Sequence, residues 1–255
     1  MNEQEAAAYW EQNAEAWTAL SRAGFDVYRD HLNTPAFLKM LPDITGLNGL
    51  DIGCGEGHNT RLLAQQGATL TGIDISPTFI KNADGEGITY LVGSATELPF
   101  ETGHFDFATS FMCLMDLPGP LPAIKEAFRV IKPGGFLQFS ITHPCYNTPH
   151  RKNLRHGNGQ TYAIEVGEYF RRLEGRVEEW SFSDAPMHMK SKYPDFKVPL
   201  FNYTLSEWVN AIITAGFTLE AVNEPMPSDE VVKEYPALQD AQVVSYFLHF
   251  LCRKL

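Results

Sequence analysis

Apolar residues along the middle of the chain alternate between short continuous runs and helical spacing. Leu50–Ile52 ends one apolar run, helical spacing begins after His58, and Ala68–Ile73 forms a second run that the acid Asp74 closes. The alternation continues through further segments: Ile88–Val92, Phe105–Ser110, Ala123–Ile131 and Phe136–Ile141. Strands that alternate with helices form a parallel sheet with helices on both faces. The pattern therefore predicts a doubly wound α/β domain.

The C-terminal part of the chain returns to regular structure. Thr204 and Glu207 have the spacing of a capping box, and Gly216 is suited to end the helix that follows. Beyond it, Phe217–Val222 and Val243–Cys252 are predicted as the last two strands. Residues 200–255 should thus complete the sheet.

The N-terminal residues 1–41 are predicted to be helical. Ala7, Trp10, Ala14 and Trp17 recur at the spacing of one helix face. We expect this apolar stripe either to pack on the sheet or to form a lid over a bound ligand.

Residues 144–199 have no regular period. The segment is far longer than an ordinary connection of about 4–6 residues, so we expect an insertion with short strands of its own. Tyr162–Phe170 and Arg176–Phe182 are the candidates for those strands. Because the insertion follows a strand of the sheet, it should lie above the edge where ligands bind and close over a substrate.

A glycine-rich turn follows the first predicted strand. Gly53, Gly55 and Gly57 let backbone approach a ligand closely, and Asp74, roughly 20 residues later, can accept hydrogen bonds from ribose hydroxyls. The GxGxG spacing differs from the GxGxxG of dinucleotide sites, and no pyrophosphate signature lies nearby. The turn therefore favours an adenosyl ligand without phosphates.

The chain at this point resembles the class I (Rossmann-like) S-adenosylmethionine-dependent methyltransferases. Asp51 with the three glycines is similar to the family's first motif, and VGSATELPF at Val92–Phe100 is similar to its third. FDFATS at Phe105–Ser110 resembles the fourth strand, and IKEAFRVIKPGGFLQFS at Ile124–Ser140 resembles the next helix, turn and strand. The resemblance implies a seven-stranded, mostly parallel sheet whose antiparallel last strand lies beside the sixth, with an N-terminal helical lid and a cap insertion after strand 5.

One methyltransferase domain is therefore expected over residues 1–255. It comprises N-terminal helices (1–41), a cofactor-binding core (42–143), a substrate-cap insertion (144–199), and the last helix and strands of the sheet (200–255).

The resemblance implies S-adenosylmethionine as methyl donor, S-adenosylhomocysteine as product, and no metal. Many relatives have an acid at the position of Ser94 to hold the adenine amino group; here the Ser94 hydroxyl and the Ala95 backbone would serve. The expected cofactor residues are Asp51, Gly53, Gly55, Gly57, Asp74, Ile75, Ser94, Ala95, Phe111, Tyr28 and Arg22.

Methyl transfer to a phenol, an amine or an acidic carbon can use a general base. His143, just past the strand Phe136–Ile141, is the first candidate, although it can equally be a turn histidine bonded to backbone; Asp116 is the second. Relatives that methylate nucleic-acid or protein amines often carry an Asn/Asp-Pro-Pro-aromatic motif where this chain has the apolar Phe111–Met115, which favours a small organic acceptor. The residues expected to line its pocket are Met112, Tyr146, Tyr169, Phe170 and Tyr9.

The formal net charge of −11 argues against a nucleic-acid partner, since phosphate binding needs Lys and Arg. Basic residues do cluster in the insertion, either as a solvated loop or as a rim that attracts an anionic small molecule: His150, Arg151, Lys152, Arg155, His156, Arg171, Arg172 and Arg176. The apolar runs are too short to span a bilayer, and the acidic start MNEQEAAAYW lacks a secretory pattern, so we expect a cytoplasmic protein without a membrane partner.

The four cysteines show no CxxC spacing and are expected as packed thiols rather than zinc ligands or disulfides. The pattern does not indicate an oligomeric state. Two other functions stay open: a dinucleotide-dependent oxidoreductase, which the GxGxG spacing and the PGG turn disfavour, and a catalytically silent adenosyl-binding module.

Overall fold

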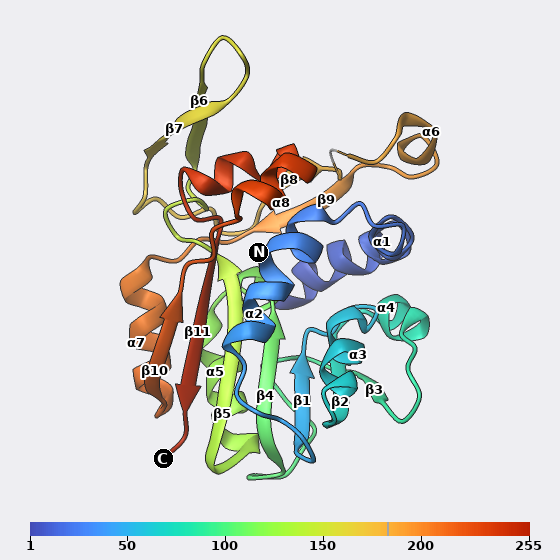
Figure 1. Cartoon of the computed structure of the whole chain (residues 1–255). Helices are drawn as coiled ribbons and strands as arrows, with labels where there is room; N and C mark the ends of the chain where they lie inside the picture. The colour runs from blue at the N-terminus through green and yellow to red at the C-terminus, as the bar shows by residue number, and fades with distance from the viewer. Residues whose placement is uncertain (183) are drawn as a thin grey trace.

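A seven-stranded sheet forms the centre of the molecule, seen here in a computed structural model that describes residues 1–182 and 184–255 (Figure 1). Its strand order is β10-β11-β5-β4-β1-β2-β3. The bounds are β1 Asn48–Ile52, β2 Thr69–Asp74, β3 Thr89–Val92, β4 Phe105–Phe111, β5 Ile131–Thr142, β10 Thr218–Asn223 and β11 Phe247–Arg253. β1 pairs in parallel with β2 and β4, whereas β11 runs antiparallel to both β5 and β10. The predicted sheet, including its antiparallel last strand, is confirmed.

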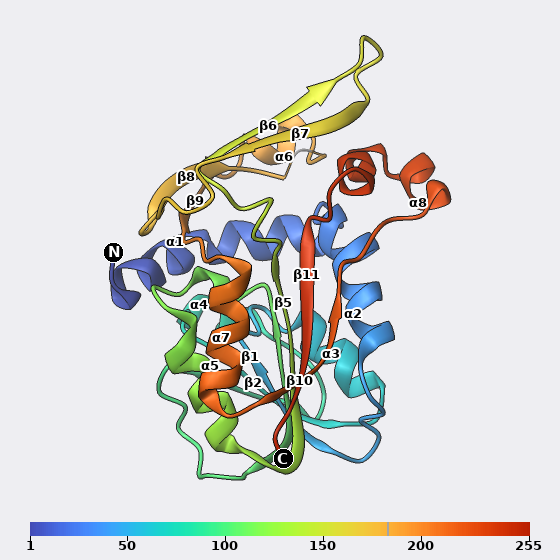
Figure 2. The ribbon, with the colours of Figure 1, turned by 90° about the vertical axis from the view of Figure 1, so that its left-hand side faces the viewer.

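Helices cover both faces of this sheet and create two cores. α5 (Pro120–Val130) and α7 (Leu205–Ala215) pack on one face, where Trp208 lies against Phe139. α2 (Thr34–Met40) and α3 (His58–Gln65) cover the other face around Phe37 and Phe107 (Figure 2). The short α4 (Pro77–Asn82) begins after β2 with Ser76 as its N-cap, as the Ser-Pro pair indicates. Because β1 to β5 run parallel to one another, their carboxyl ends lie at the same edge of the sheet.

The N-terminal helix α1 (Glu3–Arg22) crosses above that edge (Figure 1). It begins with a capping box between Asn2 and Glu5, and a π-helical segment, η1 (Arg29–Asn33), joins it to α2. The apolar stripe faces the insertion at one end, where the Trp17 ring stacks on Trp180 at a centroid distance of 5.2 Å. α1 therefore lies between the sheet edge and the insertion, rather than flat on the sheet.

The described residues of the insertion form two β-hairpins and one short helix. β6 (His150–Arg155) pairs with β7 (Thr161–Gly167), and β8 (Arg176–Trp180) pairs with β9 (Phe196–Leu200), with α6 (Met187–Lys190) between the last two strands. The β8–β9 hairpin lies over α1, and the β6–β7 hairpin projects away from the domain (Figures 1 and 2).

The last strand begins four residues later than the apolar pattern predicted, after two helical segments and a turn. α8 (Asp229–Glu234) and the 3-10 segment η3 (Pro236–Gln242) precede the strand, which begins at Phe247 instead of Val243. The N–H of Val243 still donates to the carbonyl of Asp240, so this valine belongs to the end of the helical turn. No helix of the described residues is long and apolar enough to cross a bilayer.

Candidate active site

A cavity of about 570 Å³ opens over the carboxyl ends of the parallel strands. Its floor is formed by the turn after β1 (Gly53–Glu56), by Asp74 and Ile75 after β2, and by the segment after β4 that ends at Asp116. α1 and the insertion form its roof and outer wall. Open α/β sheets bind ligands at this place.

The three glycines of the turn all have left-handed backbone, with φ of 71° at Gly53, 55° at Gly55 and 83° at Gly57. A Cβ at Gly53 would lie 2.2 Å from Sγ of Cys113, and one at Gly57 would lie 2.3 Å from the Tyr90 hydroxyl oxygen. At Gly55, which lines the cavity, no heavy atom of the described residues lies within 4 Å of that position. Two glycines therefore permit close packing, and Gly55 leaves room for a ligand.

Asp74 faces the cavity from the end of β2. Its Oδ2 accepts the backbone N–H of Gly55 and its Oδ1 that of Ser76, each over 2.9 Å. Burial raises the pKa of Asp74 to about 6, against the lowering effect of these hydrogen bonds. A carboxylate has about four acceptor positions, so Asp74 keeps acceptor capacity for a hydroxyl group of a ligand.

Asp51, expected to contact the cofactor, lies beneath the turn instead. It is buried, and its carboxylate accepts hydrogen bonds from the hydroxyls of Thr60 (2.6 Å) and Thr109 (2.9 Å). Burial raises the pKa of Asp51 to about 6. The residue thus fastens the turn to α3 and β4, which corrects the expectation of direct contact.

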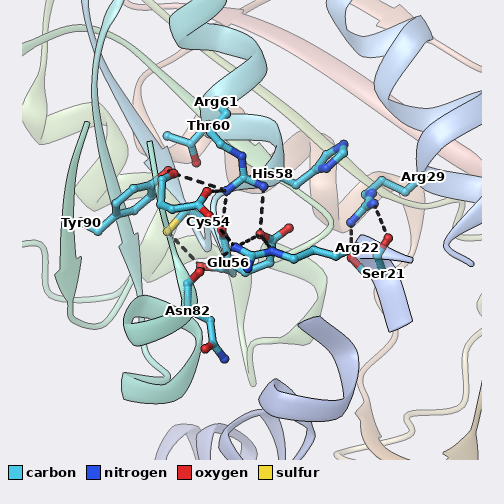
Figure 3. Close-up of polar contacts among 12 residues, drawn as sticks. Ser21, Arg22, Arg29, Cys54, Glu56, His58, Thr60, Arg61, Asn82 and Tyr90 are labelled. Carbon is cyan, nitrogen blue, oxygen red and sulfur yellow. Dashed lines mark hydrogen bonds and ion pairs between the residues drawn. The ribbon is translucent and has the colours of Figure 1, made fainter. Parts of the chain in front are cut away.

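Glu56 joins the turn to α1 through an ion-pair network that sequence analysis did not identify (Figure 3). Its Oε2 lies 2.9 Å from Nη2 of Arg22 and 2.9 Å from Nη2 of Arg61, and its side chain is 4% exposed. Both arginines also pair with Asp84. Arg22, expected at the cofactor, therefore fastens α1 to the turn, and that expectation is corrected.

Arg29 supplies a cation to the cavity from the π-helical segment. Nε donates to Asp30 over 2.7 Å. Nη1 donates to the Ser21 hydroxyl over 2.5 Å (Figure 3). His58 and Asn59 line the wall with it. No motif or spacing distinguishes Arg29 from the other basic residues of the chain, so it was missed.

The wall near β3 is apolar, with one carboxylate. Ile75 and Ala95 line it, together with Gly93 and Phe79. Ser94, expected to hold a ligand, instead donates its hydroxyl to Glu3 of α1 and accepts the backbone N–H of Thr96 over 3.0 Å. Glu3 itself lines the cavity, so the acid of this wall comes from the N-terminal helix.

The wall after β4 carries Asp116 and the aromatic Phe111, which packs on Phe37 with ring centroids 3.9 Å apart. Burial raises the pKa of Asp116 well above its ordinary value. Among the described residues the carboxyl group of Asp116 has no hydrogen-bond partner. Met112, with a φ of 55°, lines the cavity beside it.

His143 does not occupy the place expected of a general base. Its Nε2 lies 2.8 Å from Oε1 of Glu224, and its Nδ1 accepts the N–H of Cys145 over 3.1 Å. Both ring nitrogens are engaged in this turn, while the neighbouring Thr142 and Tyr146 line the cavity. The turn interpretation of His143 is therefore the correct one, and Asp116 is the candidate that faces the cavity.

Tyrosines form the end of the cavity near the insertion. Tyr28, expected at the cofactor, lies here: its hydroxyl donates to Asp240 (2.5 Å), and its ring lies 4.7 Å from that of Tyr246. The Tyr146 hydroxyl donates to the same carboxylate over 3.2 Å. The guanidinium of Arg151 lies 4.0 Å above the Tyr146 ring and also lines the cavity.

The remaining expected pocket residues lie elsewhere. The Tyr169 hydroxyl accepts the N–H of Leu205, the Phe170 side chain is 84% exposed, and Tyr9 borders a separate surface hollow with Met1 and Glu5. Aromatic character alone does not show which side chains of a hairpin or helix point inward, so these three expectations are wrong.

Most of the basic cluster in the insertion is solvated. Arg171 pairs with Glu168, and His150 with Glu165, each over 2.8 Å on the surface. The described residues hold no group of three or more His, Cys, Asp or Glu that could bind a metal. Their cysteines are free thiols, and Cys145 is exposed rather than packed.

Comparisons with known proteins agree with this geometry. Residues 50–139 match the family described as "Methyltransferase domain". Demethylmenaquinone methyltransferase of Lactococcus lactis is 37% identical over 52% of this chain and 59% of its own length. Ubiquinone biosynthesis O-methyltransferase of Xanthomonas oryzae is 37% identical over 38% of this chain and 44% of its own. The chain thus spans about half the length of these relatives.

A solved structure extends the likeness over most of the chain. The S-adenosylmethionine-dependent methyltransferase of Mesorhizobium loti superposes with a TM-score of 0.70 at 26% identity, covering 86% of this chain and 96% of that one.

Proposed function

Because this chain belongs to the class I S-adenosylmethionine-dependent methyltransferases, we propose that it transfers a methyl group from S-adenosylmethionine to a small-molecule acceptor. The observation that carries the proposal is the single cavity that continues from Asp74 and Gly55 to Asp116 and Tyr146. Both reactants can therefore meet in one space bounded by α1 and the insertion. Holding two reactants in a fixed orientation can lower the activation free energy by about 7–11 kcal/mol.

The residues of the floor fit the adenosyl ligand. Asp74 has free acceptor positions for the ribose hydroxyls, and Gly55 leaves open space above the turn. Arg29 can bind the carboxylate of the amino-acid part, and Ile75 and Ala95 can contact the base. When bound, S-adenosylmethionine supplies an electrophilic methyl group on sulfur.

The other end of the cavity fits an acceptor with an aromatic ring. Tyr28, Tyr146 and Tyr246 line it, and the relatives named for demethylmenaquinone and ubiquinone biosynthesis support an acceptor of this class. Asp116 is the group placed to hold or take the acceptor's proton, since it lines the cavity and burial raises the pKa of its carboxyl group. Whether an oxygen, a nitrogen or a carbon atom receives the methyl group depends on the chemistry of the acceptor.

The net charge and the free thiols support a small-molecule substrate and a cytoplasmic location. A net charge of −11 favours a small molecule over a nucleic acid. The free thiols of Cys54 and Cys113 support a reducing, cytoplasmic setting.

The test is a methyl-transfer assay with labelled S-adenosylmethionine and a panel of phenols, enols and quinols, with products identified by mass spectrometry. We expect transfer to at least one aromatic acceptor and formation of S-adenosylhomocysteine. Binding without turnover over the whole panel would favour a silent adenosyl-binding module. A bound nicotinamide or flavin in the purified protein would instead favour an oxidoreductase.

A further inference from the structure

Glu3, the first residue of α1, brings a carboxylate to the wall of the cavity near β3. It accepts hydrogen bonds from the hydroxyls of Ser94 and Thr96, the latter over 2.8 Å. These residues follow β3, 91 and 93 positions away in the sequence. The hydroxyls hold the carboxylate in one orientation while its side chain still lines the cavity.

The strand order indicates which part of an adenosyl ligand reaches this wall. Asp74 ends β2, and β3 is the next strand outward. A ribose on Asp74 therefore places the base either back over β1 or outward over β3. On the outward side the cavity is lined by Ile75, Phe79, Gly93 and Ala95, and Glu3 lines it as well.

We propose that Glu3 accepts a hydrogen bond from the exocyclic amino group of adenine and thereby selects adenine over a 6-oxo purine. This inference rests on the proposed function. An ionised carboxylate offers about four acceptor positions and no donor, and Ser94 and Thr96 use two of them. An amino group can be bound by the remaining positions, whereas a purine carbonyl at the same place would face only acceptor oxygens.

Because Glu3 belongs to α1, recognition of the adenine base depends on where this helix is docked. Further along the same helix, Glu11 accepts hydrogen bonds from Thr78 (Oγ1, 2.6 Å) and from the Ser76 hydroxyl (2.5 Å), which follow β2. α1 is thus held by the loops that follow two neighbouring strands. The adenine contact exists only while α1 is docked, so recognition of the base and closure of this wall occur together.

The experiment measures binding rather than turnover. Isothermal titration calorimetry of the full chain compares S-adenosylhomocysteine with S-inosylhomocysteine, its 6-oxo analogue, for the wild type, Glu3→Gln and Glu5→Gln. Glu5 lies in the same helical turn but is exposed and does not line the cavity, and its side chain accepts the N–H of the N-cap Asn2, a contact that glutamine can also form. Glu5→Gln is therefore the matched control. Circular dichroism melting curves establish that each variant is folded.

We expect the wild type and Glu5→Gln to bind the adenine ligand about 10- to 100-fold more tightly than its 6-oxo analogue, as loss of one hydrogen bond to a charged group implies. Glu3→Gln should lose most of this preference, because its amide can donate to the carbonyl. If folded Glu3→Gln keeps the wild-type preference, or the wild type has none, the role of Glu3 is overturned while the proposed function stands. If the wild type binds neither ligand, both are overturned.

Discussion

The backbone N–H of Gly55 donates a hydrogen bond to Oδ2 of Asp74 over 2.9 Å. This contact joins the turn after β1 to the end of β2 and fixes the carboxylate beside the open space above Gly55. The two residues thus contribute differently to a ligand site, one by leaving room and the other by accepting hydrogen bonds. Their contributions can be measured separately.

Gly55→Ala should abolish binding of S-adenosylhomocysteine while the protein stays folded. The added Cβ meets no protein atom of the described residues but would lie in the cavity. Gly46→Ala is the matched control, since Gly46 has a φ of 74° and equally free surroundings in the turn before β1. Both changes should destabilise the fold by about 1–2 kcal/mol, the cost of left-handed backbone for a residue with a Cβ. Calorimetry should separate them, and equal affinities would show that no ligand approaches Gly55.

Affinity for S-adenosylhomocysteine should rise with pH between 5 and 7. The ionised carboxylate of Asp74 is the better acceptor for ribose hydroxyls, and its pKa is raised to about 6 by burial. At pH 5 only about a tenth of it is ionised, so binding should be weaker by roughly tenfold. In Asp74→Asn the affinity should be lower at pH 7 and this pH dependence lost. A wild-type slope that persists in the variant would assign it to another group, such as Asp26, whose pKa is also about 6.

The stability of the ligand-free protein should have the opposite pH dependence: the contribution of Asp74 to stability should fall as the pH rises. A carboxyl group with a raised folded pKa stabilises the fold most below its unfolded pKa of 3.8, and this contribution is lost as the pH rises through about 6. Asp74→Asn should therefore gain thermal stability relative to the wild type as the pH goes from 4 to 7. Differential scanning fluorimetry across this range measures the effect.

Asp116→Asn should lower kcat by about 10²–10⁴, the range for loss of a general acid or base, while binding of S-adenosylhomocysteine changes less than twofold. His143→Gln should leave kcat nearly unchanged, because the ring of His143 contacts Glu224 and Cys145. Steady-state kinetics on one acceptor measure both variants. The reverse order of effects would restore His143 as the base.

Glu56→Gln should destabilise the fold by about 2–4 kcal/mol, because it leaves two arginines beside a buried neutral side chain. Glu178→Gln is the control: Glu178 pairs with Arg176 on the surface, where a single ion pair contributes at most about 1 kcal/mol. Urea unfolding gives both values. If both variants lower the free energy of unfolding by the same amount, the ion pairs of Glu56 contribute no more to stability than a surface ion pair does.

The sequence was sufficient for the sheet and for the floor of the cavity. Strand ends such as Asp74 and Phe111 are positioned by backbone topology, and a parallel sheet brings them to one edge whatever their side chains do. The direction in which a side chain points after the end of a strand is not set by the topology of the sheet. His143 and Asp116 both follow strands, yet only local packing turns one toward Glu224 and the other toward the cavity.

Residues distant in sequence account for most of what was missed. Arg29 lies in a π-helical segment and Glu3 in the first turn of α1, and neither carries a local signal of its target. The carboxylate that Ser94 lacks is supplied by Glu3, a pairing across 91 residues that no spacing rule contains. Patterns within one element predict that element, whereas contacts between elements depend on how they dock.

The docking of α1 also has a consequence for folding. Asn13 exchanges two hydrogen bonds with the backbone of Lys197, 184 residues later, at 3.0 and 3.1 Å. This contact closes a very long loop, so α1 emerges early during synthesis but completes its contacts only after β9 has formed. The capping box of Asn2 and Glu5 and the acidic first turn favour the helix during that interval. The roof of the cavity therefore forms only after the insertion has been synthesised and α1 has docked on β9.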